Sequence, residues 1–295
     1  MENKSTLVLT ILILFQLVTA CTSKQAKVRK QKPKDSKEIR IGITQDPAYS
    51  DLFTYAIKPE LERRGYKIKE VPLANQRSFN AMVGDGEVDL NVGQHKAYLD
   101  YTESKDRQNL SSLITIPSPM YAIYSNKLKA KNLAQLKKEL KKGDYVTIPS
   151  DPSNLACALV FLEKNGLIKL KDGPNKNYSS EYDIVENPYG LKIVPVESAQ
   201  QIPTLSSVAF GVILGTRAIN AKIFDKQIVK YKNPDESFII MFAVRTEDLN
   251  STWAQDFKSV IESEAFKNIV EDPKYIFHNY YRPEWYVKKW GIKND

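Results

Sequence analysis

Histidine and cysteine are the side chains here whose types invite chemistry, and the chain has two of each. His95 lies in the stretch "VDLNVGQHKAYLD", and Cys157 lies in "VTIPSDPSNLACALVF". A cysteine nucleophile with a histidine base is one chemistry that these types could support. Ligand binding is the other, because a helix that starts just after a buried strand presents its amides and positive dipole end to a polar group.

The local pattern favours binding over catalysis. Cys157 stands on an apolar helix, where a cysteine usually behaves as a small hydrophobic residue. Two histidines exclude a multi-histidine metal site, and the sequence has no phosphate loop, GxGxxG, GxSxG or CxxC pattern. We therefore expect no enzyme activity, no metal and no cofactor, and a cysteine-dependent hydrolase is the remaining catalytic alternative. His95 follows a predicted strand, so its ring either lines a cleft or only caps the next helix.

The other cysteine, Cys21, has the setting of a lipid-attachment site. Lys4 precedes an apolar run at 7–18, and "VTA" leads into the cysteine. The run is shorter than the ~20 residues that a transmembrane helix needs, so it reads as a signal peptide. We predict a lipoprotein signal at 1–20, a diacylglycerol on Cys21 and a location on the extracytoplasmic face of the cell membrane. An ordinary signal peptide with an incidental cysteine is the alternative.

A basic tether is predicted at 21–37. The formal net charge is +8, and eight Lys or Arg fall between Lys24 and Arg40. This stretch has almost no apolar side chains, so it cannot pack into a core. Its charge either draws it to anionic lipid headgroups or only solvates a spacer. Because the excess charge is local, we predict no nucleic-acid partner.

The rest of the chain alternates between strand and helix patterns. Strands are predicted at 39–44, 67–73, 86–92, 113–117 and 120–125, with helices at 49–64, 78–83 and 95–102. The alternation restarts with helices at 133–140, 153–165 and from 198, and strands at 145–149, 191–196, 210–215 and 238–245. A helix is expected at 252–270 and an irregular aromatic segment at 280–290. Pro59 is expected to kink its helix, and Gly65 to end it.

This order predicts an α/β protein of two lobes. The β-α-β-α-β order of the first three strands implies a parallel sheet covered by helices on both faces, and the restarted alternation implies a second α/β unit. We place the first lobe at 38–117 plus 232–295 and the second at 122–227, joined by extended crossovers near Met120 and Ile228. Ligands of open α/β sheets bind at the carboxyl ends of strands, so we expect a cleft there, with His95 facing Asn154 across it.

Several stretches carry a resemblance to a known family. They are "VDLNVGQHKAYLD" (88–100), "VTIPSDPSN" (146–154), and "EKNGLIKLKDG", "DIVENP" and "LKIVPVESAQ" between 163 and 200. They resemble the methionine-binding lipoprotein family, the NlpA-type substrate-binding proteins of ABC importers, and the similarity runs from about 39 to near 271. The resemblance implies a type II periplasmic-binding-protein-like fold that closes on a small molecule and delivers it to a membrane permease.

The resemblance also implies which residues bind the ligand. His95 and Tyr98 of the QHxxYLD motif line the pocket in this family, and Asn154 ends the DPxN turn. Three positions further, the family has an arginine that pairs with the ligand carboxylate, and this chain has Cys157.

Other pocket positions also depart from the family. Leu214 and Ile240 stand where the family has asparagines, and an aromatic pair is replaced by Gln76 and by Val92 or Gly93. Losing the arginine and both asparagines would cost a methionine zwitterion several kcal/mol, since each hydrogen bond to a charge is worth ~1.5–3 kcal/mol.

We therefore expect an importer's binding protein whose ligand, of the amino-acid or small-peptide class, differs from free methionine. The expected partners are an ABC permease with its ATPase, and the membrane through the lipid anchor. Two alternatives remain open. The protein binds methionine or a methionine-containing peptide through backbone amides and a displaced cation such as Arg77 or Arg217, or it is a surface lipoprotein that no longer serves transport.

Overall fold

The computed structural model describes residues 33, 36–44, 46–72, 77–173 and 175–294. Every described residue belongs to one compact unit, Pro33–Asp295. The predicted signal peptide, Cys21 and most of the predicted tether therefore lie outside the described residues. Within the described part, no helix has the length and apolar character needed to cross a bilayer.

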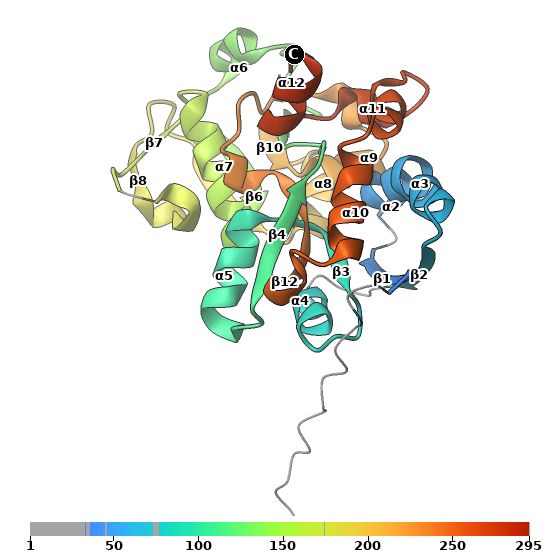
Figure 1. Cartoon of the computed structure of the whole chain (residues 1–295). Coiled ribbons are helices and arrows are strands. Elements are labelled where there is room, and N and C mark those ends of the chain that lie inside the picture. The colour runs from blue at the N-terminus through green and yellow to red at the C-terminus, as the bar shows by residue number, and fades with distance from the viewer. Residues whose placement is uncertain (1–32, 34–35, 45, 73–76, 174, 295) are drawn as a thin grey trace, which may run out of the picture. The chain divides into compact units, whose positions relative to one another are not determined.

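The first lobe is built on a five-stranded sheet in the order β2–β1–β3–β12–β4. Its strands are β1 (Glu38–Ile43), β2 (Lys67–Pro72), β3 (Leu90–His95), β4 (Leu110–Thr115) and β12 (Ile240–Arg245). β1 pairs in parallel with β2 and β3, whereas β12 pairs antiparallel with β3 and β4. Figure 1 shows β4 and β12 side by side. The parallel pairing predicted for the first three strands is confirmed. The complete sheet is mixed, because β12 returns from the second lobe in the opposite direction and pairs antiparallel with β3 and β4.

The helix predicted at 49–64 contains a wider turn in its middle. α2 (Pro47–Leu52) leads into a π-helical turn (Phe53–Ile57) and then into α3 (Lys58–Arg63). Pro59 lies in the first turn of α3, has no backbone N–H to give, and its ring would crowd the preceding turn of a regular α-helix. The π-helical turn just before it is the form that the expected kink takes.

The other helices of this lobe are α4 (Arg77–Gly84), α5 (Lys96–Asp106), α10 (Thr252–Ile261), α11 (Glu264–Glu271) and α12 (Glu284–Trp290). The single helix predicted at 252–270 is two helices, because Ser263 accepts the N–H of Phe266 at 3.2 Å and caps a new one. The segment predicted as irregular at 280–290 contains α12. Its Tyr286 is fully buried, and Trp285 donates to the carbonyl of Thr115 at 2.9 Å.

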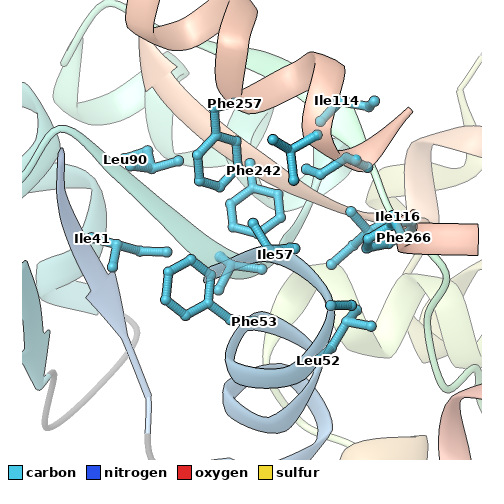
Figure 2. Packing of buried hydrophobic residues seen from close by; sticks show 14 of the residues in the cluster. Ile41, Leu52, Phe53, Ile57, Leu90, Ile114, Ile116, Phe242, Phe257 and Phe266 are labelled. Carbon is cyan, nitrogen blue, oxygen red and sulfur yellow. The ribbon is translucent and has the colours of Figure 1, made fainter. Parts of the chain in front are cut away.

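Aromatic rings fill the core between this sheet and its helices. Figure 2 shows Phe53, Phe242 and Phe257 together, and each is at most 1% exposed. The rings of Phe242 and Phe257 are 4.8 Å apart at 70°, an edge-to-face arrangement. Burying a side chain of this size stabilises a fold by ~1.5–3 kcal/mol. The cluster fixes β12 and α10, from the end of the chain, against α2 and β1 from its start.

The second lobe has its own five-stranded sheet in the order β11–β5–β10–β6–β9. Its strands are β5 (Ala122–Tyr124), β6 (Tyr145–Pro149), β9 (Lys192–Val196), β10 (Phe210–Ile213) and β11 (Val229–Lys230), with β7 (Lys169–Leu170) and β8 (Ile184–Glu186) as a separate pair. β6, β9 and β10 are parallel, and β5 is antiparallel to both β10 and β11. This sheet is also mixed, and it includes β11, which follows the predicted lobe boundary at residue 227.

The helices of the second lobe are α6 (Leu133–Glu139), α7 (Pro152–Lys164), α8 (Gln201–Thr204) and α9 (Gly215–Asn220). α7 is buried along most of its length, and Cys157 and Phe161 are 0% exposed in the core of this lobe. Asp151 caps α7 by accepting the backbone N–H of Asn154 at 3.1 Å. The helix start is therefore held at the carboxyl end of β6.

Two extended segments join the lobes. The chain leaves β4 through 116–121 to enter β5, and it returns from β11 through 231–239 to β12. Ser118 on the first crossover pairs with Tyr281, with N–H···O distances of 3.0 and 2.9 Å. The predicted bilobal α/β fold is confirmed.

Candidate ligand-binding site

A cavity of about 870 Å³ lies between the two sheets, where their strands end and helices begin. Its lining comes from both lobes and from the first crossover. Among the candidates named from sequence, the lining residues are Gly93, His95, Tyr98, Asn154, Leu214, Ile240 and one of the two candidate cations, Arg217. Gln76 lies outside the described residues, as does Cys21.

His95 is both a helix cap and a wall of the cavity. Its Nδ1 accepts the backbone N–H of Tyr98 at 3.1 Å, at the start of α5. Burial lowers the pKa of His95, so the ring is neutral, and Nε2 then carries its hydrogen. Nε2 lies 3.3 Å from Oδ1 of Asn154 in the other lobe and donates to it. The expected approach of His95 to Asn154 across the cleft is confirmed.

Asn154 links the start of α7 to both sides of the cleft. Its side-chain Nδ2 donates to Asp151 at 2.8 and 2.9 Å, which orients its Oδ1 away from that carboxylate. Oδ1 also accepts from the hydroxyl of Tyr121 on the first crossover. Asn154 thus joins His95, Asp151 and Tyr121 in one hydrogen-bonded group.

Cys157 lies behind the cavity wall. It is 0% exposed, belongs to the second-lobe core and is not among the described lining residues. Its thiol is within hydrogen-bonding reach of Tyr121, which does line the cavity. Burial raises the pKa of the Cys157 thiol well above its usual value, so the group is neutral. The first turns of α7 therefore bring an amide into the cavity, from Asn154, and no positive side chain.

Apolar and aromatic groups form much of the remaining wall. Leu214 precedes α9, and Ile240 pairs with His95 between β12 and β3. The ring of Phe238 meets that of His95 edge to face, with centroids 5.7 Å apart. Gly93 has φ +116°, and a Cβ there would lie 3.6 Å from the ring of Tyr49, so this position brings the backbone close to an aromatic wall.

Charged residues that the motifs did not reveal also line the cavity. Asp46 caps α2 in the first lobe, and Arg217 lies on α9 in the second. Asp46 stands in "QDP" just as Asp151 stands in "SDP", so a repeated Asp-Pro at a strand-to-helix junction was the available signal. Burial raises the pKa of Asp46, opposed by the Ala48 N–H, the charge of Arg217 and the side chain of Asn220.

The remaining polar groups give no metal site. Within the described part of the chain, no group of three His, Cys, Asp or Glu side chains is arranged to hold a metal ion. The arrangement is that of a cleft with amide, imidazole and aromatic walls, of the size that small molecules occupy.

Comparisons with known proteins agree with this architecture. The family model described as NlpA lipoprotein matches residues 39–285. A relative from Haemophilus influenzae, "Probable D-methionine-binding lipoprotein MetQ", is 32% identical over 234 residues, which are 77% of this chain and 81% of the relative. "Outer membrane lipoprotein 1" of Mannheimia haemolytica is 31% identical over 231 residues, 77% of this chain and 80% of that protein.

Solved structures are similar over the same region. A nutrient binding protein from Burkholderia cenocepacia bound to methionine has a TM-score of 0.70 at 28% identity, covering 79% of this chain and 95% of that one. The methionine binding protein MetQ has a TM-score of 0.68 at 28% identity, covering 80% and 94%. With a family model that matches most of its length, this chain belongs to the NlpA lipoprotein family.

Proposed function

We propose that this chain is a lipid-anchored, extracytoplasmic substrate-binding protein of an ABC importer whose ligand differs from free methionine. The observation that carries the proposal is the cavity of about 870 Å³ between the lobes. Among the described residues, α7 contributes the Asn154 amide to its lining and no positive side chain. Cavities of roughly 300–1,000 Å³ suit small ligands. The family relationship supports the transport role, and the lining supports a change of ligand.

The case against free methionine rests on the position on α7 at which the family resemblance places the partner of the ligand carboxylate. A carboxylate taken from water needs a charged or well-aligned hydrogen-bonding partner. At the position where the family resemblance implies an arginine, the neutral Cys157 is fully buried, and Leu214 and Ile240 add apolar wall. Backbone amides at the start of α7 supply partial positive charge, which is less than a guanidinium supplies.

Methionine binding through a displaced cation is the alternative. Arg217 lines the cavity and could take the carboxylate from the α9 side. Relatives named D-methionine-binding lipoproteins favour this alternative, whereas those named outer membrane lipoproteins fit a surface role without transport.

A cysteine hydrolase is disfavoured. A nucleophilic cysteine needs access to substrate and a lowered pKa, but Cys157 is 0% exposed and burial raises the pKa of its thiol. His95 donates its Nε2–H to Asn154, and its Nδ1 accepts the backbone N–H of Tyr98.

Native mass spectrometry of the mature protein, purified without denaturation, tests the function directly. We expect a small molecule of the amino-acid or short-peptide class to remain bound. Calorimetry on protein stripped of that ligand should then show methionine binding weaker than micromolar. Sub-micromolar methionine affinity would establish the displaced-cation alternative, and the absence of any small-molecule binding would favour the surface role.

A further inference from the structure

Two opposite charges face the cavity from different lobes at the end where α2 packs on α9. Asp46 belongs to the first lobe and Arg217 to the second. We propose that Asp46 binds the ammonium group and Arg217 the carboxylate of a zwitterionic ligand, which thereby bridges the lobes. This inference rests on the proposed function and specifies the ligand's charges and the residues that select them.

The guanidinium of Arg217 is available to bind an anion. It is the one Lys or Arg among the described residues that line the cavity. Its charge acts on Asp46, yet the described residues offer its guanidinium no hydrogen bond and no ion pair within 4.0 Å. A guanidinium forms paired, parallel hydrogen bonds with a carboxylate, so a ligand carboxylate suits it better than water alone does.

Asp46 is held in place for a cation. Its Oδ1 accepts the backbone N–H of Ala48 at 3.1 Å, which fixes the carboxylate at the start of α2. The side chain is partly buried beside Tyr49, whose ring also lines the cavity. A carboxylate next to an aromatic ring is a favourable setting for an ammonium group.

The other charged lining groups are engaged or lie at the rim. Asp151 accepts three hydrogen bonds from Asn154, at 2.8, 2.9 and 3.1 Å. Glu197 is exposed and lies 3.3 Å from the hydroxyl of Ser150. Arg217 is exposed as well, but it is the one Lys or Arg among the described lining residues, so it and Asp46 form the pair of opposite charge at the cavity.

The placement of α9 supports a built site. Gly215 begins this helix, and a Cβ there would lie 2.5 Å from the carbonyl oxygen of Pro119 on the first crossover. That close approach fixes α9 against the first crossover and places Arg217 at the cavity. The ligand's side chain would then extend toward the apolar wall of Phe238 and Ile240.

The experiment uses ligand-stripped mature protein and the common L-amino acids as probes, ranked by thermal shift and measured by calorimetry. The amino acid that binds best is then compared with its decarboxylated amine and its deaminated acid. We expect Arg217→Gln to weaken the affinity for the amino acid by about 10- to 100-fold and to leave the affinity for the amine unchanged. We expect Asp46→Asn to weaken the affinities for the amino acid and the amine to a similar extent and to leave the affinity for the deaminated acid unchanged.

Matched controls make the same changes outside the cavity. Asp225→Asn and Lys226→Gln remove one charge each from exposed positions after α9, and neither should change any affinity.

If Arg217→Gln weakens binding of the amine as much as binding of the amino acid, the pair only holds the lobes together and the inference is overturned. If the protein binds a ligand whose affinity neither variant changes, the binding function stands and the inference fails. If no amino acid and no co-purified molecule binds, both fail. Tight methionine binding lost in Arg217→Gln would support the pair while overturning the choice of a different ligand.

Discussion

The imidazole Nε2 of His95, at the end of β3, lies 3.3 Å from Oδ1 of Asn154, near the start of α7. The two residues come from different sheets, so this contact spans the cleft. Asn154 is also tied to Asp151, which caps α7, and to Tyr121 on the crossover. One amide side chain therefore links the closure of the lobes to the start of the central helix of the second lobe.

Asn154→Ala should favour a more open form of the protein. The change removes the hydrogen bond from His95, which is worth about 0.5–1.5 kcal/mol, and leaves the Nε2 hydrogen of the buried imidazole without this partner. Small-angle X-ray scattering of the ligand-free protein should show a larger radius of gyration. Asn132→Ala is the matched control, because Asn132 caps α6 within the second lobe and should lower stability without changing the radius. An unchanged radius for Asn154→Ala would show that other contacts hold the cleft closed.

Cys157→Arg should destabilise the fold. The thiol is 0% exposed in the second-lobe core, and a guanidinium without a partner there loses its hydration. An uncompensated buried charge costs about 3–5 kcal/mol, measurable by urea unfolding. Cys157→Ala creates only a small cavity and serves as the control. A Cys157→Arg variant of normal stability that binds methionine more tightly would show that the new side chain passes Tyr121 into the cavity.

Sequence motifs predicted the parts of the site that stand at the ends of buried strands. His95 and Asn154 belong to such motifs, and the pattern of strands and turns placed them on opposite lobes. Cys157 shows the limit of this reasoning, because its position three residues after Asn154 turns it into the core rather than the cavity. Arg217 was named only as one of two candidate cations, since nothing in a single sequence tells which surface of α9 meets the first lobe.

The fold was predicted in outline and missed in particular places. The strand order needs β12 to cross back from the second lobe, and only tertiary packing determines that it pairs between β3 and β4. The helix break at Ser263 depends on a capping hydrogen bond that competes with a continuous apolar stripe. α12 was missed because its aromatic residues have weak helix propensity, which packing of Trp285 and Tyr286 overrides.

Asp46→Asn should raise the melting temperature at pH 7. Burial raises the pKa of Asp46 above its ordinary value, so the charged form destabilises the folded state, and protonation relieves this as pH falls. The rise in melting temperature should therefore be present at neutral pH. It should vanish below about pH 4, where the carboxyl group of Asp46 is protonated and as neutral as the asparagine that replaces it. Besides burial, the groups that act on the pKa of Asp46 are the backbone N–H of Ala48, Arg217 and Asn220, which lower it, and Asp51, which raises it.

Thermal unfolding of the ligand-free protein between pH 7 and 4 measures this, with Asp225→Asn as the exposed control. Asparagine also caps helices well, so the cap on α2 is kept. A melting temperature lowered at pH 7 would mean that the attraction of Arg217 outweighs the burial of the carboxylate.

Cys21→Ala should release the protein from the membrane fraction or leave its precursor uncleaved. A thioether-linked diacylglycerol, with a further acyl chain, gives stable anchoring because each buried CH₂ contributes about 0.8 kcal/mol. Fractionation and immunoblotting measure location and processing together. Cys157→Ala should stay in the membrane fraction, since that residue lies in the folded core. Normal processing and retention of the Cys21→Ala protein would contradict a lipid anchor at this residue.

Gly215→Ala should disturb both stability and ligand binding through backbone crowding. An added Cβ would lie 2.5 Å from the carbonyl oxygen and 2.6 Å from the carbonyl carbon of Pro119, and neither backbone atom can move without shifting the crossover. Overpacking of this kind costs about 1–3 kcal/mol. Because α9 carries Arg217 and packs on α2, its displacement should also weaken binding of the best amino acid. Gly173→Ala is the control, since a Cβ there meets nothing within 4 Å and should leave urea unfolding and calorimetry unchanged. If Gly215→Ala lowers stability while affinity is preserved, the crossover rather than α9 has moved, and Arg217 keeps its place at the cavity.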